Sequence, residues 1–150
     1  MKRTRLRRRS KTPRSKAKKA AWDQFSKFIR LRDALLTTGT KHDAECITCR
    51  RVYPIKKMQA GHFIPGRSNA VLFDEYGVFC QCIQCNVFKH GDSLRYRRRM
   101  VKKYGETRVQ EMEILARVPK HIHIFEFRLI QEFYVRAYKE LGGMECLNTN

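Results

Sequence analysis

The sequence predicts an α+β fold in which a small, zinc-stapled centre lies between helices. Apolar residues recur at helical spacing in residues 20–36 and again in the C-terminal part, over 93–141. The residues between these parts are short extended segments, and two Cys-x-x-Cys pairs lie among them. Helices segregated around a few short strands are typical of the α+β class.

The first helix and the strands are predicted from spacing and turn residues. Over residues 20–36 the apolar side chains fall on one helical stripe. Residues 45–53 are expected to form a short hairpin around the first Cys pair, and residues 58–64 a second extended segment closed by Pro-Gly. A further strand is expected near residues 76–80, inside a loop.

Glycine and proline divide the rest of the chain into four helices. Gly91 breaks the first, and Asp92 or Ser93 can cap the second. Gly105 ends the second helix and Pro119 stops the third. These helices are expected at residues 83–90, 94–104, 106–118 and 122–141.

The charge of the chain indicates a polyanionic partner. Lys and Arg number 33 against 14 acidic residues, a formal net charge of +19, which favours nucleic acid over an acidic membrane surface. Eleven basic residues and no acid lie within residues 1–19. We expect a disordered DNA-binding arm there, including Arg7, Arg8 and Arg9, and a single domain over 20–150. A solvated tail is the alternative.

No membrane segment or secretory signal is expected. No apolar run approaches the roughly 20 residues that span a bilayer, and no apolar stretch follows the basic N-terminal residues. Six cysteines in such a chain favour metal ligation over a disulfide framework.

The two Cys-x-x-Cys pairs are the strongest metal-binding motif. Cys46 and Cys49 form one pair, Cys82 and Cys85 the other, with 32 residues between them. Tetrahedral Zn²⁺ takes four soft ligands from converging segments, so we expect one structural zinc ion. A redox pair or buried free thiols are the alternatives. Cys80, beside the second pair, is expected to be packed rather than a ligand.

Three further residues could support hydrolysis of a phosphodiester bond. His62 lies between the Cys pairs and could deprotonate water. Asn86 follows Cys85 directly, and His90 is four residues further, so both would share a helical face and touch one divalent ion. Taken singly, each has a structural explanation, such as a packed histidine or a helix cap. Their order along the chain favours the catalytic interpretation.

This order of motifs resembles a family of phage nucleases. It is similar to the HNH, or His-Me finger, nucleases, and most closely to the NinG (Rap) recombination endonucleases of lambdoid phages; the zinc-braced endonuclease VII of T-even phages is also similar. The resemblance covers about residues 20–118. The residues that carry it are Cys46-Ile47-Thr48-Cys49, Ala60-Gly61-His62-Phe63, Leu72-Phe73-Asp74-Glu75-Tyr76-Gly77, Gln81-Cys82-Ile83-Gln84-Cys85-Asn86, Lys89, Gly91, Tyr96 and Tyr104-Gly105.

The resemblance implies a ββα-metal (His-Me finger) core at about residues 45–91, flanked by helices. It implies a metal-dependent DNA endonuclease that cuts branched recombination intermediates, such as Holliday junctions and D-loops, in the cytoplasm of a bacterial host. His62 would be the general base, and Asn86 and His90 would hold Mg²⁺ or Mn²⁺, with no small-molecule cofactor. The alternatives are a non-catalytic zinc-braced DNA-binding module and an HNH nuclease that acts on duplex DNA in homing, restriction or packaging.

Two positions depart from the family pattern. Gly61 stands where the family often has a metal-binding Asp or His, and Gly77 stands where an Asn often orients the base. Asp74 or Glu75 could supply a carboxylate instead. Otherwise Asn86, His90, waters and substrate phosphates would hold the ion, as Mg²⁺ allows.

The helices after this core carry two further expectations. The last helix, 122–141, either packs on the N-terminal helix or forms a homodimer interface, which would suit a four-way junction. On the helix 94–104, Tyr96 and Met100 are expected to face the core, and the basic residues are expected to contact phosphates, a solvated face being the alternative. The basic residues of this helix are Arg95, Arg97, Arg98, Arg99, Lys102 and Lys103, and Lys89, which precedes the helix, is expected to contact DNA with them.

Overall fold

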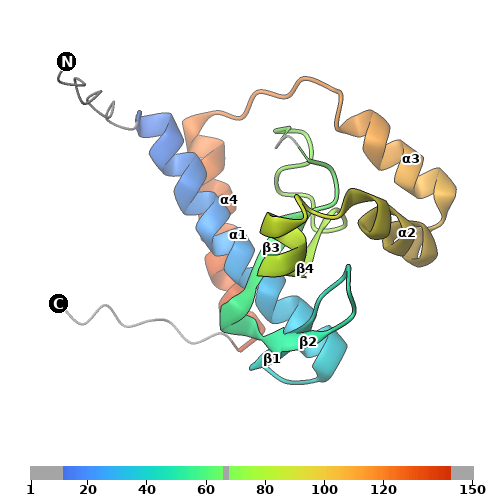
Figure 1. Cartoon of the computed structure of the whole chain (residues 1–150). Helices are drawn as coiled ribbons and strands as arrows, with labels where there is room; N and C mark the ends of the chain where they lie inside the picture. Colours follow the sequence, from blue (N-terminus) through green and yellow to red (C-terminus); the bar gives the residue numbers. More distant parts are fainter. Residues whose placement is uncertain (1–11, 66–67, 143–150) are drawn as a thin grey trace, which may run out of the picture.

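In the computed structural model, residues 12–65 and 68–142 are described. A long N-terminal helix lies beside the C-terminal helix, and two small sheets and a pair of helices pack on one side of it (Figure 1). The arrangement is α+β, as expected. The elements are α1 (Pro13–Thr38), β1 (Asp43–Glu45), β2 (Val52–Pro54), the 3-10 turn η1 (Ile55–Lys57), β3 (Met58–His62), β4 (Val78–Cys82), the π-helix η2 (Gln84–Phe88), α2 (Ser93–Tyr104), α3 (Glu106–Leu115) and α4 (Ile124–Glu140).

Helix α1 begins seven residues earlier than the sequence pattern predicted. The Thr12 side chain caps it by accepting a hydrogen bond from the Ser15 N–H, and Pro13 occupies the first turn, where it leaves no backbone donor unpaired. Alanine and the long basic residues that follow are good helix formers. Residues 13–19 are therefore helical rather than part of a disordered arm. Arg7, Arg8 and Arg9 lie outside the described residues.

The strands form two antiparallel pairs. Strands β1 and β2 pair around the first Cys-x-x-Cys turn, with Ala44 opposite Tyr53. Strands β3 and β4 form the second sheet, with Ala60 opposite Cys80 and His62 opposite Val78. The expected hairpin and extended segments are confirmed with bounds shifted by about two residues. The β3–β4 pair places His62 at the end of the sheet.

An aromatic cluster holds α1 against α4 and the β3–β4 sheet. The rings of Phe25 and Tyr134 meet edge to face, with centroids 4.8 Å apart, and Phe25 is fully buried. Burying one such side chain contributes about 2–3 kcal/mol. Ala60 and Val78 of the sheet belong to the same cluster. Of the two alternatives for the last helix, packing on the N-terminal helix is confirmed.

The outer face of α4 remains apolar. Phe125, Leu129 and Phe133, spaced four residues apart, are each more than half exposed. The exposure of these side chains does not show whether two copies of the chain associate, so the homodimer stays a prediction.

Among the described helices, none is long and apolar enough to cross a membrane.

Helix α2 is anchored to the β3–β4 sheet by Tyr96. As expected, Tyr96 and Met100 are fully buried. The Tyr96 hydroxyl donates to the Gly61 carbonyl at 2.8 Å and accepts from the Phe79 N–H at 3.1 Å, so one side chain contacts both strands. Burial raises the pKa of Tyr96 well above its usual value. Gly105 ends α2 with φ 84°, whereas α3 ends at Leu115, three residues earlier than predicted.

Candidate active site and metal centre

Four cysteines from the two Cys-x-x-Cys turns meet at one point. The sulfur atoms of Cys46, Cys49, Cys82 and Cys85 all lie within 4.8 Å of one another. The Sγ atoms of Cys49 and Cys82 are 3.9 Å apart, close to the spacing of about 3.8 Å that Zn–S bonds of about 2.3 Å give in a tetrahedron. This cluster could bind a metal ion such as zinc.

The chemistry of the four thiols fits a bound cation. Burial raises the pKa of Cys46 and of Cys85 above the usual thiol value. Buried thiolates need a positive charge beside them, and a soft divalent ion supplies it. The backbone also supports the cluster, since the Cys82 N–H lies 3.4 Å from Cys46 Sγ. These donors match the all-thiolate set of structural zinc sites.

Cys80 lies apart from this cluster, as expected. It is fully buried, and its Sγ lies 3.8 Å from the Arg30 carbonyl of α1. Its own N–H donates to the buried Asp33 carboxylate at 2.6 Å. Burial raises the pKa of Cys80. Cys80 is therefore part of the packing between α1 and β4.

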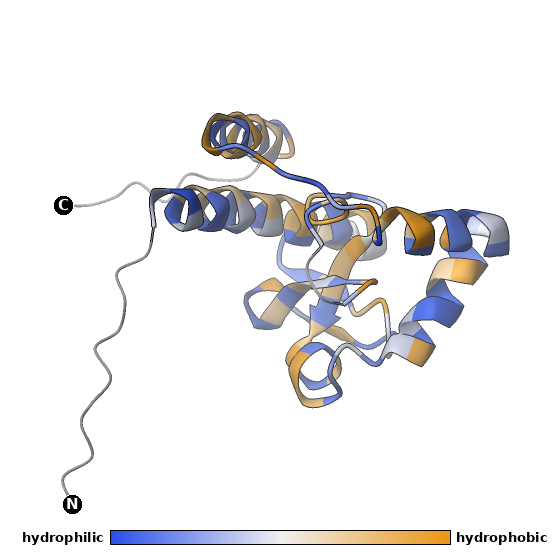
Figure 2. Cartoon of the chain, turned by 90° about the horizontal axis from the view of Figure 1, so that it is seen from above, coloured by the Kyte–Doolittle hydropathy of each residue, from blue (hydrophilic) through white to orange (hydrophobic). Residues whose placement is uncertain are grey.

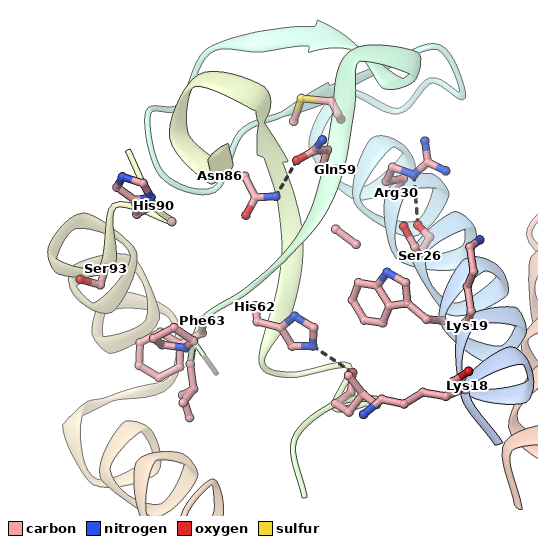
Figure 3. A pocket seen from close by; sticks show the side chains of 18 residues that line it. Lys18, Lys19, Ser26, Arg30, Gln59, His62, Phe63, Asn86, His90 and Ser93 are labelled. Atoms are coloured by element: carbon pink, nitrogen blue, oxygen red, sulfur yellow. Dashed lines mark hydrogen bonds between the residues drawn. The ribbon is translucent and has the colours of Figure 1, made fainter. Parts of the chain in front are cut away.

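A pocket of about 710 Å³ lies between α1, β3 and the segment from η2 to the start of α2. His62, Asn86 and His90, which the sequence singles out, all line it. Figure 3 shows His62 between two walls, with Lys18, Lys19, Ser26 and Arg30 on one side and Asn86, His90 and Ser93 on the other. The structure thus brings the three predicted residues to one cavity.

The imidazole of His62 is held from two sides. Its Nε2 lies 3.1 Å from the Leu72 carbonyl oxygen, and its ring stacks on the Trp22 indole with centroids 4.7 Å apart. Because a carbonyl only accepts, this hydrogen bond places the proton on Nε2. Nδ1 is then the basic nitrogen of the neutral ring.

Asn86 is oriented by a neighbouring amide. Its Nδ2 donates to Gln59 Oε1 at 2.6 Å, across from η2 to β3 (Figure 3). The side chain uses its nitrogen for this bond, so Oδ1 is the atom available for a hard cation. Asn86 follows Cys85 directly, which ties its position to the cysteine cluster.

The predicted helical face shared by Asn86 and His90 is wrong. Residues 84–88 form a π-helix that ends at Phe88, and His90 lies in the following turn with φ 51°. The Lys89 N–H donates to the Gln84 carbonyl, five residues back, so the turn is wider than in an α-helix. Asn86 and His90 nevertheless line the same pocket, because the turn at Gly91 folds the chain back.

Gln81 explains why position 61 is a glycine. A Cβ at Gly61 would lie 2.8 Å from Gln81 Cδ and closer still to its Oε1. The buried Gln81 amide donates to the Thr48 hydroxyl and to the Gly91 carbonyl, and its Oε1 has no hydrogen-bond partner among the described residues. The space for a metal-binding side chain at position 61 is therefore filled by Gln81.

The carboxylates proposed as substitutes lie elsewhere. Asp74 accepts from the Tyr76 N–H and lines a second pocket beside α3. Glu75 accepts from the Tyr134 hydroxyl at 3.0 Å. Neither is among the described residues that line the pocket of His62. The expectation that one of them replaces the missing ligand is not supported, because their loop faces α3 and α4.

One wall of the pocket was not predicted from the sequence. Its residues come from α1 and share the face of the helix that looks toward His62. The spacing of three or four residues was visible, but only tertiary packing turns this face toward β3. These residues are Ser15, Lys18, Lys19, Trp22, Ser26 and Arg30.

The basic residues of α2 differ in their surroundings. Arg97 is bonded to Glu106 and Glu113 of α3, and both bonds raise its pKa. Lys103 lies over the rings of Phe79 and Tyr104. The others are largely open to solvent: Lys89, Arg95, Arg98 and Lys102 are exposed, and Arg99 is half-buried.

Comparison with known proteins identifies the family. The family model described as "Bacteriophage Lambda NinG protein" matches residues 1–143. The chain is 31% identical over 102 residues to Protein ninG of Escherichia phage 933W and of Salmonella phage P22, and 30% identical to that of Escherichia phage lambda. Each match covers 67% of this chain and 46% of the relative, so the chain spans about half the length of these relatives. No solved structure matches significantly. The chain therefore belongs to the bacteriophage NinG family.

Proposed function

We propose that this protein is a metal-dependent DNA endonuclease that hydrolyses phosphodiester bonds in branched recombination intermediates, with His62 as the general base. The observation that carries the proposal is the pocket itself. A histidine with a fixed tautomer, an oriented asparagine and a second histidine line one cavity. The preference for Holliday junctions and D-loops rests on the resemblance to recombination nucleases.

The geometry of His62 suits a general base. Its Nε2–H is bound to the Leu72 carbonyl, so Nδ1 takes the proton from a water molecule. The oxygen of that water attacks the phosphorus, and the bond from phosphorus to the leaving oxygen breaks. Trp22 keeps the ring plane fixed during this step. A general base of this kind contributes about 10²–10⁴-fold to the rate.

A divalent ion would be held by Asn86 Oδ1 and by His90. Bound there, Mg²⁺ or Mn²⁺ would stabilise charge on the phosphate and on the leaving oxygen. Because Gln81 fills the space where a side chain at position 61 would lie, the chain offers the ion few ligands. Such ions commonly keep several waters. A zinc ion on the four cysteines would fix the position of Asn86, because Asn86 directly follows the ligand Cys85 in the chain.

The β3–β4 pair followed by η2 supports the likeness to the ββα-metal core of His-Me finger nucleases. In this proposal strand β3 carries the base, η2 carries Asn86, and the turn after η2 carries His90. The π-helical form of η2 and the closed space at Gly61 are the features in which this chain differs.

Cleavage assays with two histidine variants test the proposal. Purified wild type, His62→Ala and His42→Ala are incubated with a four-way junction, a D-loop, a flap and a linear duplex, in Mg²⁺ or Mn²⁺. His42 is exposed and is not among the residues that line the pocket. We expect wild type and His42→Ala to cut the branched substrates, and His62→Ala to lose at least about 100-fold in rate while keeping DNA binding. No cutting by any of the three proteins would indicate a DNA-binding module without catalysis, and equal cutting by all three would show that His62 is not the base.

A further inference from the structure

We propose that the pocket-facing side of α1 is a DNA-binding wall that holds the sugar–phosphate backbone of one strand against His62. The wall is defined by Ser15, Lys19, Trp22, Ser26 and Arg30. This inference rests on the proposed function for the identity of the bound polymer, but it concerns binding rather than cutting. It assigns part of the basic N-terminal region to an ordered surface.

The wall is continuous along one face of the helix. Its members are separated by four, three, four and four residues, which is the spacing of one side of an α-helix. From Ser15 to Arg30 the helix rises about 22 Å. The N-terminal turns of α1 are coloured mostly as hydrophilic in Figure 2. The wall is therefore long enough to follow several consecutive nucleotides.

The charge of the pocket is of one sign. Among the described residues that line it, Lys18, Lys19 and Arg30 are cationic, and none is Asp or Glu. A cavity with basic walls and no acid attracts a polyanion. The Asn86 side chain faces this charged wall across the cavity, and His62 stacks on Trp22, a member of the wall (Figure 3).

The cations of the wall are placed so that they can bind a phosphate. The Arg30 guanidinium is held by its Nε–H, which donates to the Ser26 carbonyl at 3.2 Å, and an arginine has further N–H groups that can donate to a phosphate. Lys19 pairs with Asp23, and both side chains are about half exposed. A surface pair of this kind is worth about 0–1 kcal/mol, so a phosphate can replace the carboxylate.

The chemistry of the wall favours one strand over two. Between the cations Lys19 and Arg30, the wall carries the aromatic ring of Trp22. Surfaces that bind single strands combine basic residues along the backbone with aromatic side chains beside the unpaired bases. We therefore assign a single strand, such as the one exposed at a branch point, to this wall.

Two charge-matched double variants test the wall. Lys19→Gln/Arg30→Gln removes two cations that line the pocket, and Lys16→Gln/Lys27→Gln removes two from the same helix that do not. Binding to a 12-nucleotide single strand and to a 12-base-pair duplex is measured by fluorescence anisotropy at several salt concentrations, without added Mg²⁺ or Mn²⁺. Circular dichroism of each variant checks that the helices are kept.

For the single strand, the pocket variant is expected to bind at least about tenfold more weakly than the control variant. The slope of its plot of log K against log salt concentration is expected to become shallower by about 1.4, because each of the two lost phosphate contacts contributes about 0.7 to the slope. The affinity for the duplex is expected to fall less. Equal losses of affinity in the two double variants would overturn the proposal of a DNA-binding wall. An equal loss of affinity for the duplex and for the single strand would overturn the assignment to one strand. Because no cutting is measured, this outcome is independent of whether His62 is a catalytic base.

Discussion

The indole ring of Trp22 stacks on the imidazole ring of His62, with planes 16° from parallel and centroids 4.7 Å apart. Trp22 belongs to α1, whereas His62 ends strand β3, so 39 intervening residues fold to bring the two rings together. The stack and the bond to Leu72 fix the ring plane and the tautomer together. The N-terminal helix is therefore part of the candidate active site.

Replacing Trp22 should separate the effect of stacking from the effect of folding. Trp22→Phe keeps an aromatic face and should keep cutting within a few-fold, whereas Trp22→Leu lets the imidazole tilt. Misplacing a reacting group by about 1 Å can cost about 10²-fold, so we expect Trp22→Leu to cut on the order of tenfold more slowly or worse. Single-turnover cleavage measures this. An equal rate for the two variants would show that the stack does not position the base.

Trp22 is also the only tryptophan of the chain, so its emission reports the stack directly. His62→Ala should change the intensity or wavelength of that emission, and His42→Ala should leave it unchanged. This readout does not depend on DNA or on catalysis.

Gly61 should not tolerate a side chain while Gln81 is present. A Cβ at position 61 would collide with the Gln81 carboxamide, which is fully buried and bonded to Thr48 and Gly91. Overpacking of this kind costs about 1–3 kcal/mol, so Gly61→Ala should lower the free energy of unfolding by that amount. Urea denaturation measures it.

The matched test for Gly61 is a double-mutant cycle. In a Gln81→Ala background the collision partner is gone, so Gly61→Ala should cost clearly less there than in the wild type. An equal cost in both backgrounds would place the strain elsewhere.

Removing one cysteine of the cluster should remove the metal. Elemental analysis should find about one zinc per chain in the wild type. Cys49→Ser should lose most of it and unfold the β1–β2 turn, because binding of a structural metal is coupled to folding. Cys80→Ala is the control, since Cys80 is buried outside the cluster. A folded, zinc-free wild type, or equal zinc loss in both variants, would contradict a structural zinc site.

The cysteine cluster and the α2 core face could be predicted because their signals are local. Each Cys-x-x-Cys turn presents two thiols by its own geometry, and Tyr96 and Met100 lie one helical turn apart, so both are recognisable from spacing. The start of α1 at Pro13 is harder to predict, because dense positive charge with few apolar residues is typical of disorder. Thr12 and Pro13 are the local cap signals that indicate a helix start there.

The remaining features depend on packing between distant segments. Arg30 and His62 share a pocket only because α1 crosses the β3–β4 sheet. Gln81 fills the space over Gly61 from the neighbouring strand, and no pattern within either strand signals it. The π-helix at residues 84–88 has the same apolar spacing as an α-helix over so short a segment, so periodicity could not distinguish them.

Two neighbouring arginines of α2 should contribute differently to DNA binding. Arg97 is held by Glu106 and Glu113, whereas the described residues give Arg98 no ion pair and leave it exposed. Arg98→Gln should therefore weaken binding to duplex DNA several-fold and flatten the salt dependence by about 0.9, as expected for one lost phosphate contact. Arg97→Gln should have a smaller effect on binding.

The opposite order is expected for stability. Arg97 links α2 to α3 through both glutamates, and Glu106 has a lowered pKa because it accepts from Arg97. Arg97→Gln should lower the midpoint of thermal unfolding at pH 7, and Arg98→Gln should not. A lowered pKa means that the folded state gains from the ionised carboxylate, so the gap between the two variants should close as the pH falls through the folded-state pKa of Glu106. Thermal scans of both variants over that pH range measure the gap, and a gap that stays constant would mean that Arg97 acts through packing rather than through its charge.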